Sequence, residues 1–180
     1  MITGRLEPDS GIYEWGVTTT QTYLPRNSSD EFDHNEMTIV DWLRQYAEKE
    51  EQDNTFLRNF LGRMLFRGDD VLKPVNVLSG GEKVRCLLSK MMLSKANVLI
   101  LDQPTNHLDL ESITALNDGL IKFKGAILMA SHDYEVLDTT CNRVIELTPN
   151  GAYDLINTTY GEYVNNQDAQ QRIAKLYETK

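Results

Sequence analysis

The sequence predicts an α/β protein with a mostly parallel sheet, and two observations carry that prediction. Val98–Leu101 and Ala126–Ala130 are continuous apolar runs, as expected of strands that are buried on both faces of a sheet. Segments with helical apolar periodicity alternate with these runs along the chain. Such alternation implies parallel strands that are connected and covered by helices.

The first part of the chain predicts two short strands followed by a helical block. Ile12–Val17 and Thr20–Leu24 alternate between polar and apolar residues, and Pro25 ends the second strand. Helices are predicted over Thr38–Tyr46 and Asn54–Phe66, because their apolar residues recur on one stripe.

From residue 78 onward, helices and strands are predicted in turn. One helix carries the apolar stripe from Val84 to Met92, and a second extends from Leu110 to Leu120. A third strand is predicted at Arg143–Leu147, and Asn150–Gly151 is a typical hairpin turn leading into Ala152–Ile156.

Composition narrows the class of protein. The 180 residues are 41 % hydrophobic and 25 % charged, which excludes a disordered or collagen-like chain. The net charge of −9 disfavours a simple basic surface for nucleic acid, although a polynucleotide could still be contacted elsewhere. No apolar run approaches the ~18 residues that span a bilayer. With no leader and with Cys86 and Cys141 expected as packed thiols, we expect a cytoplasmic protein without a membrane span.

A glycine-containing helix start is the first candidate site. Ser79 and Glu82 have the spacing of a capping box, which any helix can use. Gly80 and Gly81 are unexpected there, since glycine in a first helical turn costs entropy. Without side chains they let backbone N–H groups approach a ligand, and the helix dipole favours an anion.

Polar residues at the ends of two predicted strands form the second candidate site. Asp102 follows Val98–Leu101, and Ser131-His132-Asp133 follows Ala126–Ala130. Ligands of open parallel sheets gather at the carboxyl ends of strands. A carboxylate there needs compensation, and Mg²⁺ beside phosphates commonly provides it. The alternative is that Asp102 only caps the next turn.

Together these segments resemble the motifs of ATP-binding cassette (ABC) ATPases. Leu78–Glu82 resembles the signature motif, Val98–Asp102 the Walker B strand, Leu108-Asp109 the D-loop, and Ser131–Asp133 the switch-histidine segment. The order and spacing of the motifs also agree with the family. Pro104–Asp109, with Glu82-Lys83 after the glycines, is similar to the ABC-F branch, whose members are soluble twin-cassette proteins that act on ribosomes.

The resemblance covers nearly the whole chain and implies a P-loop NTPase-like fold with a helical subdomain. It places the core at residues 1–26 and 78–160, the helical subdomain at 36–77 and a C-terminal tail at 161–180. Polar composition predicts a loosely docked helix in that tail. The resemblance also implies ATP and Mg²⁺ as ligands.

The family's phosphate loop, Gly-x-x-x-x-Gly-Lys-Ser/Thr, does not occur in these 180 residues. The opening residues resemble the stretch that follows it, so we expect a cassette that lacks the phosphate-loop strand and helix. Its remaining strands would then be incompletely covered. That expectation predicts marginal stability or association with another chain.

Several positions have specific roles by resemblance. Asp102 would hold the metal, and Ser79, Gly80, Gly81, Glu82 and Asp109 would contact nucleotide. Gln103 stands where the family has a catalytic glutamate, and an amide is a very poor base, so slow or absent hydrolysis is expected.

The remaining positions concern phosphate sensing. Arg26 occupies the position of the Q-loop glutamine, where an arginine could contact phosphate or simply lie at the surface. His132 would sense the γ-phosphate, and His107 would orient the D-loop.

The leading hypothesis is one half of an ATP sandwich. In this family each ATP lies between the phosphate loop of one cassette and the signature helix of a second cassette. The short stretch between Arg26 and Ser79 favours the second cassette of an ABC-F protein, whose ATP-driven closure would act on the ribosome. The helix start at Ser79 and the acid at Asp102 are expected to flank a triphosphate. The alternatives are a nucleotide-binding subunit of a transporter and a degenerate cassette that only folds and pairs.

Overall fold

The computed structural model describes residues 2–4, 6–24 and 31–178. The chain divides into two compact units. One comprises residues up to 116 together with 123–130, and the other comprises 117–122 together with residues from 131 onward. Helix α4 (Leu110–Lys122) contributes residues to both units.

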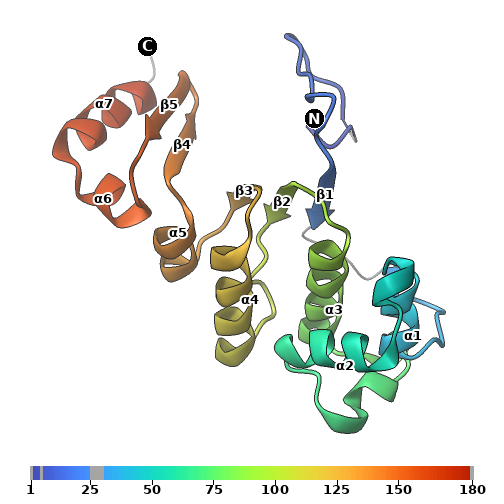
Figure 1. Cartoon of the computed structure of the whole chain (residues 1–180). Helices are drawn as coiled ribbons and strands as arrows, with labels where there is room; N and C mark the ends of the chain where they lie inside the picture. The colour runs from blue at the N-terminus through green and yellow to red at the C-terminus, as the bar shows by residue number, and fades with distance from the viewer. Residues whose placement is uncertain (1, 5, 25–30, 179–180) are drawn as a thin grey trace. The chain divides into compact units, whose positions relative to one another are not determined.

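The first unit contains a three-stranded parallel sheet, which confirms the predicted fold class (Figure 1). The strands are β1 (Gln21–Leu24), β2 (Val98–Asp102) and β3 (Ala126–Ala130), in the order β1-β2-β3. Helix α3 (Gly80–Leu93) packs against β1. The central strand β2 is buried along its middle, as its apolar run predicts.

The prediction that Ala126–Ala130 is buried on both faces is wrong. Exposed and half-buried residues alternate along β3, and the Leu128 side chain is 44 % exposed. Among the described residues β3 pairs only with β2, so it is an edge strand with little cover, in agreement with the expectation of incompletely covered strands.

The strand predicted at Ile12–Val17 is also wrong, because these residues have no ladder partner in the described sheet. The Ile12 side chain is 99 % exposed. A turn follows, in which Thr19 donates to the Gly16 carbonyl at 2.9 Å. Alternating polarity alone does not make a strand without an edge to pair with.

The helical block folds as predicted, with shorter helices. It contains α1 (Ile39–Arg44), η2 (Lys49–Glu51), α2 (Asn54–Arg63), η3 (Gly68–Leu72) and η4 (Val75–Val77). The side chains of Thr38 and Asp53 cap the first turns of α1 and α2. The core includes Ile39, Trp42, Leu43, Leu57 and Leu61. Tyr46 and Phe56, at the ends of the predicted stripes, are exposed.

The second unit contains an antiparallel hairpin. Its elements are α5 (Tyr134–Thr140), β4 (Arg143–Thr148), β5 (Gly151–Ile156), α6 (Tyr160–Asn165) and α7 (Gln167–Tyr177). Thr148 pairs with Gly151, which confirms the turn predicted at Asn150–Gly151. The tail forms two helices that bury Tyr163, Ala169 and Ile173, and α7 contacts both strands.

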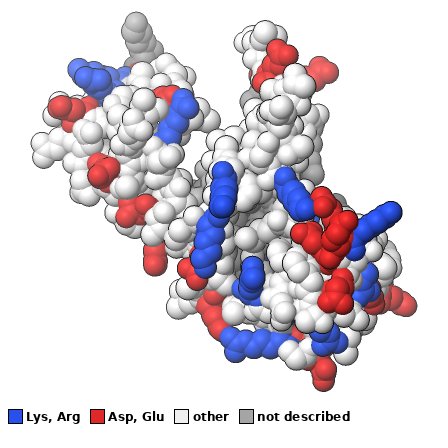
Figure 2. Space-filling view, viewed as in Figure 1, with Lys and Arg blue, Asp and Glu red and all other residues white. Residues whose placement is uncertain are grey.

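The surface of the first unit carries charges of both signs. On the face shown in Figure 2, lysines and arginines lie beside aspartates and glutamates. Examples are the ion pairs of Lys73 with Asp70 at 2.8 Å and of Lys90 with Glu31 at 2.7 Å. In the part of the chain that is described, no helix is both long enough and apolar enough to cross a membrane.

Candidate functional site

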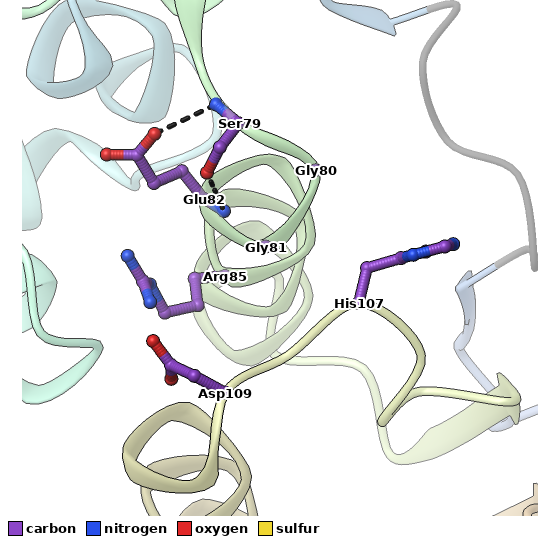
Figure 3. Close-up of a pocket in the computed structure, with 7 residues that line it drawn as sticks. All are labelled: Ser79, Gly80, Gly81, Glu82, Arg85, His107 and Asp109. Carbon is purple, nitrogen blue, oxygen red and sulfur yellow. Dashed lines mark hydrogen bonds between the residues drawn. The ribbon is translucent and has the colours of Figure 1, made fainter.

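The start of α3 is closed by the capping box that the sequence predicts (Figure 3). The Ser79 N–H donates to Glu82 Oε2 at 2.8 Å, and the Glu82 N–H donates to Ser79 Oγ at 3.3 Å. Burial alone would raise the pKa of the Glu82 carboxyl. The hydrogen bonds from Ser79 and the charge of Lys73, 3.4 Å away, nevertheless hold that pKa below its ordinary value.

The two glycines at this helix start lie in different surroundings. A Cβ on Gly81 would lie 2.9 Å from the His107 carbonyl oxygen, closer than side chains come to backbone. A Cβ on Gly80 would lie 3.7 Å from the His107 Cβ, an ordinary contact. Gly81 therefore admits the neighbouring backbone, whereas the exposed Gly80 leaves space at the surface.

An open cavity of about 560 Å³ lies at this helix start. Figure 3 shows its lining, with Asp109 near Arg85 and the His107 ring directed away from both. The lining residues are Ser79, Gly80, Gly81, Glu82, Arg85, His107 and Asp109. The cavity thus brings together five of the nucleotide-contacting residues that the sequence predicts.

The Asp109 carboxylate is held by the first turn of α4. The Ser112 N–H donates to Asp109 Oδ1 at 2.9 Å. The hydroxyl and then the N–H of Ser112, together with the positive charge of Arg85, hold the pKa of Asp109 below its usual range. Asp109 is therefore an ionised group at the rim of the cavity at neutral pH.

The segment between β2 and Asp109 is a loop with strained ends. Gln103 and His107 have φ values of +54° and +65°, in the left-handed region that few side chains adopt. The Gln103 N–H donates to the Ala130 carbonyl at 2.8 Å, which fixes one end of the loop to β3. At the other end the His107 carbonyl lies against Gly81.

Asp102 and Gln103 do not line this cavity. Asp102 is the last residue of β2, half-buried and paired in register with Ala130. The structure therefore gathers Ser79–Glu82 and Asp109 at one cavity, whereas Asp102 and Gln103, in the segment that resembles Walker B, lie outside its lining.

Two other predicted positions lie elsewhere. His132 is exposed and belongs to the second unit, where Ser131 Oγ accepts the Asp133 N–H at 3.1 Å and Asp133 caps α5. Arg26 lies outside the described residues.

Arg85 is the lining residue that sequence reasoning missed. It lies one helical turn after Gly81, on the same side of α3 as Glu82, so helical spacing was the available signal.

Magnesium chemistry is compatible with this arrangement. The described residues contain no group of three or more His, Cys, Asp or Glu side chains that could hold a metal ion. Mg²⁺ beside phosphates commonly uses one or two carboxylates and takes its other ligands from phosphate and water. Asp102, a half-buried carboxylate at a strand end, fits that limited role.

The fold and the cavity define an α/β domain with an open site at a helix start, and comparison with known proteins identifies its family. A family model described as "ABC transporter" matches residues 1–106. The chain therefore belongs to the family of ABC ATP-binding proteins.

Named relatives agree with this assignment. The chain is 58 % identical over 177 residues to the uncharacterized ABC transporter ATP-binding protein YkpA of Bacillus subtilis, covering 98 % of this chain and 32 % of YkpA. It is 33 % identical over 167 residues to the energy-dependent translational throttle protein EttA of Escherichia coli K12, covering 91 % of this chain and 29 % of EttA. The chain thus spans about a third of the length of these relatives.

Solved structures support the fold. A chain described as RNase-L Inhibitor superimposes with a TM-score of 0.71 at 24 % identity, covering 98 % of this chain and 33 % of that one. An archaeal ribosome recycling factor, aABCE1, in complex with stalk protein aP1, gives a TM-score of 0.69 at 22 % identity, covering 98 % and 33 % of the two chains.

Proposed function

We propose that this chain supplies the signature-helix half of an ATP sandwich, whose phosphate loop comes from a second cassette. The observation that carries the proposal is the cavity at the capped start of α3, with Ser79 and Gly80 exposed on it. The backbone of Gly80 and Gly81 and the positive end of a 14-residue helix favour a phosphate there.

The same chain would serve a second nucleotide through its other surface. Asp102 would hold Mg²⁺ and Gln103 would orient water. By resemblance to the family, His132 of the second unit would have the separate role of contacting a γ-phosphate. Because Asp102 and Gln103 are not in the α3 cavity, we assign the two surfaces to different nucleotides. This replaces the expectation that Ser79 and Asp102 flank a single triphosphate.

Gln103 implies slow hydrolysis and therefore a long-lived closed state. A carboxylate can polarise the attacking water as a base, and an amide cannot accept its proton. Bound ATP would therefore keep two cassettes closed for long periods.

We assign the intact protein to the ABC-F branch, acting on the ribosome in the cytoplasm. The sequence of the Pro104–Asp109 segment and the similarity to EttA, a translational throttle protein, support this assignment. The second candidate is the nucleotide-binding subunit of a transporter, which the name of the YkpA relative favours. Association with a membrane permease would favour the transporter subunit.

The test uses a chimera in which this chain replaces the matching third of YkpA. We expect Mg²⁺-dependent ATP binding by calorimetry and compaction by small-angle scattering, with neither in the 180-residue chain alone. Tight ATP binding by the chain alone would contradict the proposal.

A charge placed at the cavity tests the site itself. Gly80→Glu puts a carboxylate where the phosphate would lie, so it should abolish compaction of the chimera, while its Cβ makes only an ordinary contact with His107. Gly62→Glu, on α2 in open space, is the matched control. Equal compaction in both variants would remove the α3 cavity from the nucleotide site.

A further inference from the structure

Arg85 lies where three segments of the first unit meet. Its Nη1 donates to Ser112 Oγ, which joins α3 to the first turn of α4. Its guanidinium also lies 5.2 Å from the centre of the Phe66 ring, in the helical block. One side chain on the signature helix thus contacts both the first turn of α4, just after the Asp109 loop, and the helical block.

Ser112 connects Arg85 with the cavity. Its side chain is buried, at 1 % exposure, and its N–H donates to Asp109 Oδ1 at 2.9 Å. Its hydroxyl accepts from Arg85 and retains a proton to donate. The contacts therefore run from the guanidinium through Ser112 to the carboxylate at the rim.

The position of Arg85 is costly, which argues that it is specific. Its Nε is buried and has no hydrogen-bond partner among the described residues. An unsatisfied buried donor is unfavourable, so the Ser112 and Phe66 contacts must hold the side chain in place. Lysine would keep the charge but has no planar group to stack on Phe66 while donating to Ser112.

The Asp109 loop itself also rests on α3, two residues before Asp109. The His107 carbonyl occupies the space above Gly81, so α3 touches the loop directly at Gly81 and reaches Asp109 through Ser112 of α4 at Arg85. Arg67 pairs with Glu111 nearby at 3.2 Å, but both of these side chains are largely exposed and contribute little to rigidity.

We propose that Arg85 is a positioning residue: acting through Ser112, it holds Asp109 and its loop at a set spacing from the glycine side of α3. The consequence for nucleotide binding rests on the function proposed above. The positioning itself does not, and it can be tested on the 180-residue chain.

The first test follows Asp109 by NMR titration of its ¹³C carboxyl signal. Arg85→Met and Ser112→Ala should each raise the pKa of Asp109. The double variant should raise it by less than the sum of the two single shifts, because both changes break one chain of contacts. Arg67→Met, which removes the exposed neighbouring arginine, is the control and should leave the Asp109 pKa unchanged. An unshifted pKa in Arg85→Met would overturn the proposal.

Arg85→Lys separates positioning from charge. If Arg85 positions Ser112, lysine should not restore the wild-type titration of Asp109. Full restoration by lysine would show that only the positive charge matters, and would overturn the proposal. If Arg85→Met fails to fold, Arg85→Lys and Ser112→Ala still provide the answer.

The second test uses the YkpA chimera. Arg85→Met should weaken ATP affinity about tenfold, the size expected for losing a hydrogen bond from a charged group. Unchanged affinity in Arg85→Met, with wild-type chimera binding ATP, would overturn the role in nucleotide binding. A wild-type chimera that binds no ATP would instead count against the proposed function, while the titration still decides the positioning.

Discussion

Strands β2 and β3 have nearly the same apolar content in different surroundings. β2 lies between two strands and buries Leu99, Ile100 and Leu101. β3 pairs on one side only among the described residues, and Leu128 at its centre is 44 % exposed. An apolar run therefore indicates that a strand is suited to a buried position. Whether the strand is buried depends on the elements that pack beside it.

The largest expected effect comes from truncating the central strand. Leu99→Ala removes a 2 % exposed side chain and should lower the free energy of unfolding by about 3 kcal/mol. Leu128→Ala on β3 should cost less than about 1 kcal/mol, because much of that side chain already meets solvent. Urea denaturation of the 180-residue chain measures both. Equal losses would mean that β3 is covered in solution.

The polar end of β2 differs from the family pattern at position 103, where this chain has glutamine and the family has glutamate. In the YkpA chimera, Gln103→Glu should accelerate ATP hydrolysis about a hundredfold, since it supplies a general base. Phosphate release at saturating ATP is the measurement. Gln103→Met, which has similar length and no base, should give no acceleration. An unchanged rate for Gln103→Glu would remove position 103 from the water-activating role.

The adjacent glycines Gly80 and Gly81 also lie in different surroundings and can be compared by substitution. Gly81→Ala should lower stability by about 1–3 kcal/mol, because its Cβ would meet the His107 carbonyl at 2.9 Å. Gly80→Ala should change stability by less than about 0.5 kcal/mol. Thermal unfolding compares the two variants directly. Similar midpoints would show that the loop moves aside from Gly81.

The two free cysteines should differ in reactivity, the smallest of these effects. Burial raises the pKa of both thiols, and Cys86 is the more buried of the two. At pH 8 iodoacetamide should label Cys141 slowly and leave Cys86 unlabelled until the chain is denatured. Peptide mass spectrometry reads this out. Labelling of Cys86 in the native chain would indicate opening around α3.

Local signals predicted the elements that depend on local contacts. The Ser79–Glu82 box, the hairpin at Asn150–Gly151 and the buried strand at Val98–Leu101 all form as expected. The errors at Ile12–Val17 and Ala126–Ala130 concern residues whose burial depends on a partner strand, which no local pattern specifies.

The site residues were predictable where they belong to one contiguous motif, and not where distant segments meet. The capping pair, the glycines and Asp109 belong to contiguous motifs, and the structure gathers them at one cavity. Arg85 and Ser112 are 27 positions apart in sequence, so their contact follows only from the tertiary fold, which brings the first turn of α4 to Arg85. The requirement for glycine at position 81 likewise follows only from the fold, which brings the His107 carbonyl beside it.

The left-handed backbone at Gln103 and His107 has a consequence for mutational scanning of this chain. Valine, isoleucine and threonine should be selected against at both positions, even where no chemistry is measured, since branching at Cβ is poorly tolerated at positive φ. Glycine and asparagine should survive there. Intolerance to substitution at position 103 would then have two sources, the backbone conformation and the chemistry of the side chain. Only a growth assay paired with a measurement of protein abundance would separate them.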